Sequence, residues 1–211
     1  MESEELGCVV GYYAEHAACT CQPLNKQRPG FNSGITFVAA GAGQLAGAPA
    51  PKDSVMSEWV KKGATFVVTL VKKDKEKALF EEVQAQVEAL GLQDCWLHAP
   101  INGIRNSLGS LRCAADIAEL LQKPGVSVVV HCAQGKHRTG TMCYLILRHL
   151  GLNPEDALRS ILEMRPVCHS ELTAPNACRE GSLWAMAERL FTEKLQNSRE
   201  DMSVEASRPA N

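Results

Sequence analysis

A strand, a tight loop and a helix follow one another over residues 126–150, and this succession constrains the fold more than any other part of the chain. Val126–Val130 is rich in β-branched residues, as expected of a buried strand. Thr141–Leu150 is apolar and long enough for a helix that ends at Gly151. Because the first N–H groups of a helix have no partner within it and the helix dipole adds positive potential, such a loop predicts an anion site.

The loop between them, residues 131–140, places Cys132 six residues before Arg138 and seven before Thr139. The field that attracts an anion also stabilises a thiolate, so we expect a pKa in the range of about 3.5–7.5 for Cys132. This thiolate can attack phosphorus, while the planar fork of Arg138 can hold two phosphate oxygens. The Thr139 hydroxyl can donate to the sulfur. These three residues are the predicted catalytic group.

The rest of the loop is expected to bind phosphate through its backbone and its positive charge. His131 is expected to support the loop rather than to carry a proton. The alternative interpretation, a buried Cys132 with Arg138 at the surface, does not explain three adjacent basic residues at a strand-to-helix turn. The predicted substrate-binding residues of the loop are Ala133, Gln134, Gly135, Lys136 and His137.

The ten residues resemble the signature of the cysteine-dependent phosphatases, His-Cys-x5-Arg-Ser/Thr. The Trp59-bearing segment 57–63, the run Phe66–Val71 and the segment from Ala157 to Arg165-Pro166 are similar to the small dual-specificity phosphatases, including the cyclin-dependent-kinase-associated phosphatases. The resemblance implies a single α/β domain over residues 30–195, with three layers and a largely parallel sheet flanked by helices. It places the phosphate loop at the carboxyl end of a central strand, as is general for open α/β sheets.

For the function, the resemblance implies hydrolysis of phosphotyrosine or phosphoserine/threonine in proteins through a thiophosphoryl enzyme, without a cofactor. A phosphoprotein is the expected partner, including one bound to a kinase. One departure concerns the aspartate that family members carry on a loop roughly thirty residues before the cysteine, where this chain has Asn102 or Gly103. An amide cannot act as a general acid, whose loss typically costs about 10²–10⁴-fold. His98 is a candidate acid, with packing at a strand edge as the alternative.

Two further functions remain open. Gly135–Gly140 resembles the loop of the atypical phosphatases that cleave inositol pyrophosphates, and Gly103-Ile104-Arg105 is similar in layout to their Gly-x-Lys pattern. Arg105 would then join Lys136 and His137 around a polyanionic small molecule, although the Lys-Glu-Pro-Phe that follows in that branch is missing. The other alternative is a phosphate-binding module whose catalysis is weak because the acid is absent.

Bulk properties exclude several classes of protein. A chain of 211 residues with a net charge of −2 fits one domain with terminal extensions and gives no basis for general nucleic-acid binding. No apolar run reaches the roughly 20 residues that span a membrane, and the acidic start lacks the pattern of a secretory signal. We therefore expect a protein of the cytoplasm, with the nucleus as an alternative, that binds neither nucleic acid nor membrane.

The nine cysteines are odd in number and have no repeating spacing, which argues against a disulfide framework. Cys95, Cys113 and Cys143 lie in periodic apolar segments and are expected in the core. The group His16, Cys19 and Cys21 lacks a second matching pair of ligands, so no metal site is expected.

Periodicity and breakers give the remaining elements. The segments 1–29 and 196–211 are expected to be irregular and disordered, respectively. Strands are expected at 35–40, 65–71 and 95–99, helices at 55–62, 78–90, 111–121, 153–164 and 182–196, a loop at 41–53 and a solvated charged turn at 72–77.

Overall fold

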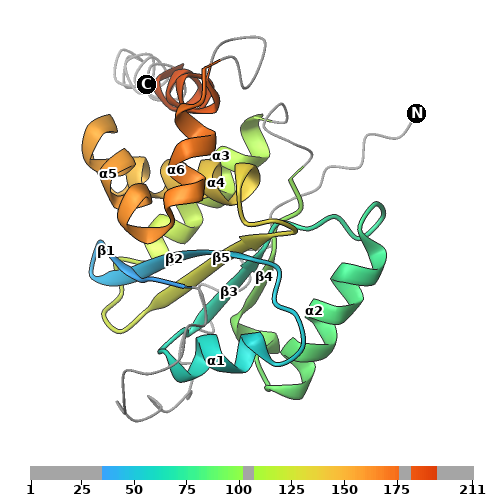
Figure 1. Ribbon diagram of the computed structural model, residues 1–211. Helices are drawn as coiled ribbons and strands as arrows, with labels where there is room; N and C mark the ends of the chain where they lie inside the picture. The colour runs from blue at the N-terminus through green and yellow to red at the C-terminus, as the bar shows by residue number, and fades with distance from the viewer. Residues whose placement is uncertain (1–34, 102–106, 176–181, 194–211) are drawn as a thin grey trace, which may run out of the picture.

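The computed structural model describes residues 35–101, 107–175 and 182–193, so the predicted N-terminal segment 1–29 and tail 196–211 lie outside the described residues. Helix and strand alternate along the chain (Figure 1). Residues 183–193 are also helical. The other elements are β1 (Val38–Ala40), β2 (Gly43–Pro49), α1 (Val55–Lys61), β3 (Phe66–Thr69), α2 (Lys77–Ala89), the short 3₁₀ helix η2 (Gln93–Cys95), β4 (Trp96–His98), α3 (Ser107–Leu120), β5 (Ser127–Cys132), α4 (His137–His149), α5 (Pro154–Met164) and α6 (Pro166–Thr173).

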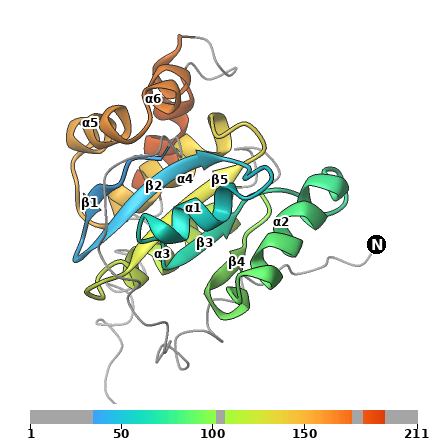
Figure 2. The same cartoon turned by 60° about the horizontal axis from the view of Figure 1, so that its bottom comes forward.

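The sheet has five strands in the order β1-β2-β5-β3-β4. The β1–β2 pair is antiparallel, and the other pairs are parallel. Helices α3 to α6 cover one face, while α1 and α2 cover the other (Figures 1 and 2). The predicted three-layer α/β fold with a largely parallel sheet is therefore confirmed, and β5 is its central strand.

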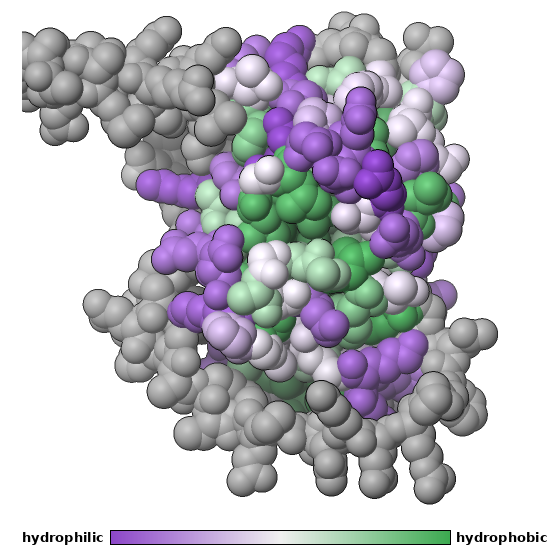
Figure 3. All heavy atoms as spheres, turned by 90° about the vertical axis from the view of Figure 1, so that its left-hand side faces the viewer, coloured by the Kyte–Doolittle hydropathy of each residue, from purple (hydrophilic) through white to green (hydrophobic). Residues whose placement is uncertain are grey.

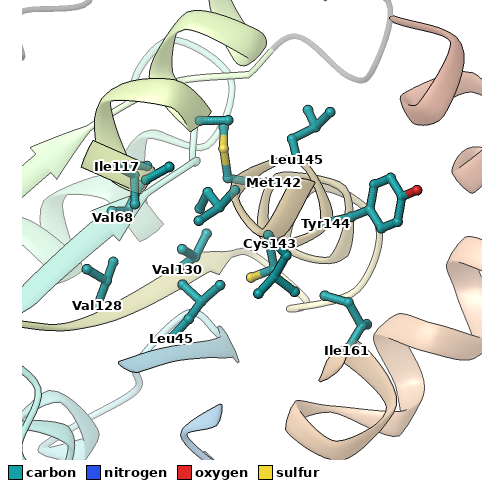
Figure 4. Packing of buried hydrophobic residues seen from close by; sticks show 14 of the residues in the cluster. Leu45, Val68, Ile117, Val128, Val130, Met142, Cys143, Tyr144, Leu145 and Ile161 are labelled. Carbon is teal, nitrogen blue, oxygen red and sulfur yellow. The ribbon is translucent and has the colours of Figure 1, made fainter. Parts of the chain in front are cut away.

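All six residues of β5 are buried, because successive side chains point into the two different cores. Val128, Val130 and Cys132 face the larger core, which is built around α4 (Figure 4). Val129 faces the smaller core under α1, where Trp59 is fully buried. This double burial explains the nearly continuous β-branched run in the sequence.

Strand β2 corrects the prediction that residues 41–53 form a loop. Its sequence, Gly-Gln-Leu-Ala-Gly-Ala-Pro, has few residues with strand propensity, yet it pairs with β5 over its whole length. Small side chains are needed in β2 because other segments of the chain pack closely against it. A Cβ on Gly43 would lie 2.4 Å from the Val126 carbonyl oxygen, and one on Gly47 would lie 3.1 Å from the Thr139 side chain. Packing therefore outweighs the low propensity of the segment.

Three other predicted boundaries change. Helix α4 begins at His137 rather than at Thr141, so Arg138 and Thr139 belong to its first turn. The predicted end of a helix at Arg165-Pro166 is followed at once by α6, because Pro166 occupies the first turn of a new helix. The strand predicted at 35–40 is shorter, β1 alone. By contrast, the predicted start of α5 is confirmed, since the Asn153 side chain accepts a hydrogen bond from the Asp156 amide at 2.9 Å.

The surface over α5 and β1 shows hydrophilic residues interspersed with apolar areas (Figure 3). Among the described residues, the large hydrophobic side chains that are exposed are those of Leu90 and Leu162. Within this same part of the chain, no helix combines the length and apolar composition needed to cross a bilayer. The predicted core cysteines Cys95, Cys113 and Cys143 are buried, as are Cys132 and Cys168.

Candidate active site

The loop between β5 and α4 lies at the carboxyl end of the central parallel strand, where the fold brings several connections together. Gly135 is at its tightest point, with a φ of +62°. A Cβ there would lie 2.3–2.5 Å from backbone atoms of Ala48 and Pro49. Only glycine fits, so the loop rests directly on the end of β2.

Cys132 is 2% exposed at the end of β5. Burial alone would raise the pKa of its thiol. Hydrogen bonds from the Thr139 hydroxyl and from the backbone of Lys136 and Thr139, together with the charge of Arg138, outweigh burial and lower the pKa from its ordinary value of 9.0. The first turn of α4 therefore favours a thiolate at Cys132, while the nucleophilic role of this residue stays a prediction.

Arg138 is fixed by Glu76, at the residue before α2. Its two terminal nitrogens donate to the two carboxylate oxygens of Glu76 at 2.8 and 2.7 Å, and one also donates to the Leu70 carbonyl at 3.1 Å. The hydrogen bonds with Arg138 lower the pKa of Glu76 despite partial burial. This two-point contact sets the plane of the guanidinium before any anion arrives.

The expected exposure of the turn at 72–77 is thus wrong for one residue. Glu76 was missed because a carboxylate in a turn with four lysines looks solvated, and its partner is 62 positions away. The sequence signal that could have found it is its place in the connection from a buried strand to the next helix, at the sheet edge that also holds the Cys132 loop.

His131 is fully buried below the loop, and burial lowers its pKa to about 3. It is therefore neutral near pH 7. Its Nε2 lies 2.7 Å from the Thr69 hydroxyl, which also accepts a hydrogen bond from the Trp96 indole at 2.8 Å. Since indole can only donate, the Thr69 proton is available for His131. These hydrogen bonds connect the start of the loop to β3 and β4, and the supporting role of His131 stays a prediction.

Helix α6 contacts the opposite side of the loop. Arg165 Nε and the Cys168 thiol both donate to the Gly135 carbonyl, at 2.7 and 3.2 Å. Further along the helix, Glu171 lies 2.7 Å from His137 Nε2 and 3.5 Å from Lys136 Nζ. Arg165 appeared in the sequence analysis only as part of a resemblance, and Cys168 and Glu171 were not singled out, because α6 itself was not predicted.

The predicted site residues on the upstream loop, Asn102, Gly103 and Arg105, lie outside the described residues. His98, the candidate acid, lies at the end of β4 with its Nε2 2.8 Å from the Val71 carbonyl and its ring against Phe80. Burial lowers its pKa. Its contacts match those of a histidine packed at a strand end.

The described site residues thus form one constellation: a buried thiol of lowered pKa, a guanidinium held in a fixed plane, and a hydroxyl on the sulfur. Such an arrangement can bind a tetrahedral oxyanion and attack its central atom. Among the described residues, no three histidine, cysteine or acidic side chains gather as metal ligands do. With the three-layer fold, these features define the class of cysteine-based phosphatases.

Comparison with known proteins gives the family. The model of the tyrosine phosphatase family matches residues 58–194, and the chain belongs to that family. A comparison with curated proteins found no match. Among solved structures, the chain is similar to a crystal structure of kinase associated phosphatase in which serine replaces the catalytic-site cysteine. The likeness has a TM-score of 0.50 at 16% identity and covers 66% of this chain and 86% of the other, which supports the fold.

Proposed function

We propose that the protein hydrolyses phosphate monoesters on phosphoproteins, at phosphotyrosine, phosphoserine or phosphothreonine, through a thiophosphoryl enzyme. The observation that carries the proposal is the lowered pKa of Cys132, a buried thiol placed between the Thr139 hydroxyl and the Arg138 guanidinium. A module that only bound phosphate would have no need of an ionised nucleophile at this point.

In the first step, the Cys132 sulfur forms a bond to phosphorus as the bond from phosphorus to the leaving oxygen breaks. The N–H groups of Arg138 that do not donate to Glu76 or Leu70, on Nε and Nη2, and the backbone amides of residues 133–137 stabilise the charge on the phosphate oxygens. The leaving oxygen takes up a proton. An aryl oxygen needs less help from an acid than an alkyl oxygen does, so phosphotyrosine fits best a site in which Asn102 or Gly103 replaces the usual aspartate.

In the second step, water attacks phosphorus and releases its proton to the solvent, the sulfur–phosphorus bond breaks, and the electron pair returns to sulfur. Thr139 supports this step by donating its hydroxyl to the departing thiolate, the same contact that lowers the pKa of Cys132. We further propose a location in the cytoplasm or nucleus, where a nucleophilic thiolate stays reduced.

The test is turnover of an aryl phosphate by the full chain and by Cys132→Ser. We expect the variant to lose turnover, because a hydroxyl at this position does not ionise, while it still binds inorganic phosphate through Arg138 and the loop. Equal turnover by the variant would refute the nucleophile. An unchanged melting temperature is the control for folding.

The substrate class is then resolved by assaying a phosphotyrosine peptide, a phosphothreonine peptide and an inositol pyrophosphate side by side. Because the fold is similar to that of a kinase associated phosphatase, phosphorylated kinases are the first protein substrates to assay. The inositol pyrophosphate is included because Lys136, His137 and Arg138 are adjacent in the loop.

A further inference from the structure

We infer that Glu171 determines specificity at this site: by holding Lys136 and His137 it limits the affinity of the loop for substrates that carry additional phosphate groups. The inference rests on the proposed function, since it names which phosphate compounds the same site prefers. It concerns the rim of the loop, whereas Cys132 and Arg138 act on the phosphate that reacts.

The first observation is that the start of α6 and one of its faces contact the loop between β5 and α4. Arg165 is the N-cap residue of α6, while Cys168 and Glu171, three residues apart, share one face of the helix. The first two bind the Gly135 carbonyl, and the third reaches the next two residues of the loop. One helix face therefore both anchors the loop and presents a carboxylate to its basic side chains.

The second observation is that packing holds the part of α6 that carries Glu171 beside the loop. Leu172 and Cys168 are 0% and 1% exposed and lie against Gly140, where an added Cβ would come within 3.2–3.4 Å of them. The helix is thus packed on the first turns of α4. This packing keeps the Glu171 side chain within reach of Lys136 and His137.

The third observation concerns charge. The side chains of Lys136 and His137 are 40% and 57% exposed, so both can reach an anion in solvent. One carboxylate lies within hydrogen-bonding distance of His137 and within 4 Å of Lys136. A second phosphate group on a substrate would have to displace Glu171 from these two side chains before it could bind them.

The first phosphate is affected less. Arg138 has its own carboxylate partner, Glu76, on the opposite side, and the backbone amides of the loop do not depend on Glu171. A neutral residue at position 171 is therefore expected to alter the binding of polyanions more than the binding of a single phosphate. This difference separates a specificity role from a purely structural one.

The test measures equilibrium binding of inorganic phosphate and of tripolyphosphate to the full chain by titration calorimetry. Cys132→Ser serves as the parent, so that no turnover is needed. We expect Glu171→Gln to tighten tripolyphosphate about two- to fivefold, in line with an exposed ion pair, and to change phosphate binding much less. Glu163→Gln, which removes the same charge from an exposed position of α5, is the matched control.

A second comparison tests the route of the effect. When Lys136 and His137 are both replaced by Gln, the gain from Glu171→Gln should vanish, since the carboxylate then has no cation to hold. The inference is overturned if both ligands tighten equally, if Glu163→Gln has the same effect, or if the gain persists without the two basic residues. Turnover of an aryl phosphate by the natural chain separately tests the proposed function, and the binding result stands whichever way that assay falls.

Discussion

At the scale of single residues, the site depends on a competition around Cys132. Burial makes a thiolate unfavourable, and only the hydrogen bonds from the first turn of α4 and the charge of Arg138 reverse this. At two other described cysteines near the loop, burial outweighs the groups that favour a thiolate: it raises the pKa of Cys168 to about 12 and that of Cys143 well above its ordinary value. Whether one of these cysteines ionises therefore depends on its position, and only at Cys132 is the thiol pKa lowered.

This contrast predicts the pH dependence of alkylation. Because a lowered pKa keeps Cys132 ionised at lower pH, its reaction with iodoacetamide should rise with a midpoint below 9.0, and Thr139→Ala should move the midpoint upward by removing a donor to the sulfur. The rate in Cys132→Ser is subtracted to correct for other thiols. Thr192→Ala, at an exposed position of the last helix, is the control. A midpoint at or above 9.0 in the natural chain would contradict the assigned electrostatics.

Cys132, Arg138 and Thr139 could be proposed from the sequence because the signature is local: they lie within one loop and helix turn. Glu76 and Glu171 escaped because their roles depend on contacts made far along the chain, 62 and 34 positions from their partners. A charged residue in a turn or on a helix gives no sign of such a partner until the fold places both at the same sheet edge.

At the scale of elements, helices and strands with clear periodicity were predicted to within a few residues, as α1, α2 and α5 show. Strand β2 was not, because its Gly and Ala residues suit a loop equally well in isolation. Its role becomes visible only from its neighbours, since Gly47 faces Thr139 and the end of the strand supports Gly135. The least strand-like segment thus carries the phosphate loop.

This support predicts an unequal pair of glycine substitutions. Gly135→Ala meets both a positive φ and backbone atoms at 2.3–2.5 Å, so it should destabilise the fold by about 3 kcal/mol or more and impair phosphate binding. Gly151→Ala has a φ of +91° but nothing within 4 Å, so it should cost only about 1–2 kcal/mol. Urea unfolding of both variants measures the difference, and equal losses would show that the loop does not rest on β2.

At the scale of the whole molecule, α4 joins the site to the last described helix, residues 183–193. Arg148 on α4 pairs with both carboxylate oxygens of Glu188, which also accepts from the Tyr144 hydroxyl at 2.6 Å, and the Trp184 indole donates to that hydroxyl at 2.9 Å. Burial raises the pKa of Glu188, but the hydrogen bonds from Arg148 and Tyr144 outweigh it and lower the pKa overall.

A folded-state pKa below the ordinary 4.5 means that Glu188 stabilises the fold above that pH and loses this contribution as the pH falls through the lowered value. Glu188→Ala should therefore destabilise the protein by about 1–3 kcal/mol at pH 7, and the difference from the natural chain should shrink in acid. Thermal unfolding at pH 7 and pH 4 measures this. Glu193→Ala, in an exposed pair with Arg189, is the control and should cost under about 1 kcal/mol. A similar loss of stability in both variants would show that Glu188 does not hold the last described helix to α4.

The contact between α6 and the Gly135 carbonyl has a consequence for comparing related chains. The residue that faces the basic side chains of the loop stands 34 positions after His137, on a helix that the loop sequence does not specify. Two chains with the same ten-residue signature can therefore differ in the charge presented beside it, simply through position 171. Relatives sorted by their loops alone would be grouped together while selecting different anions, and sorting them by this helix position would separate them.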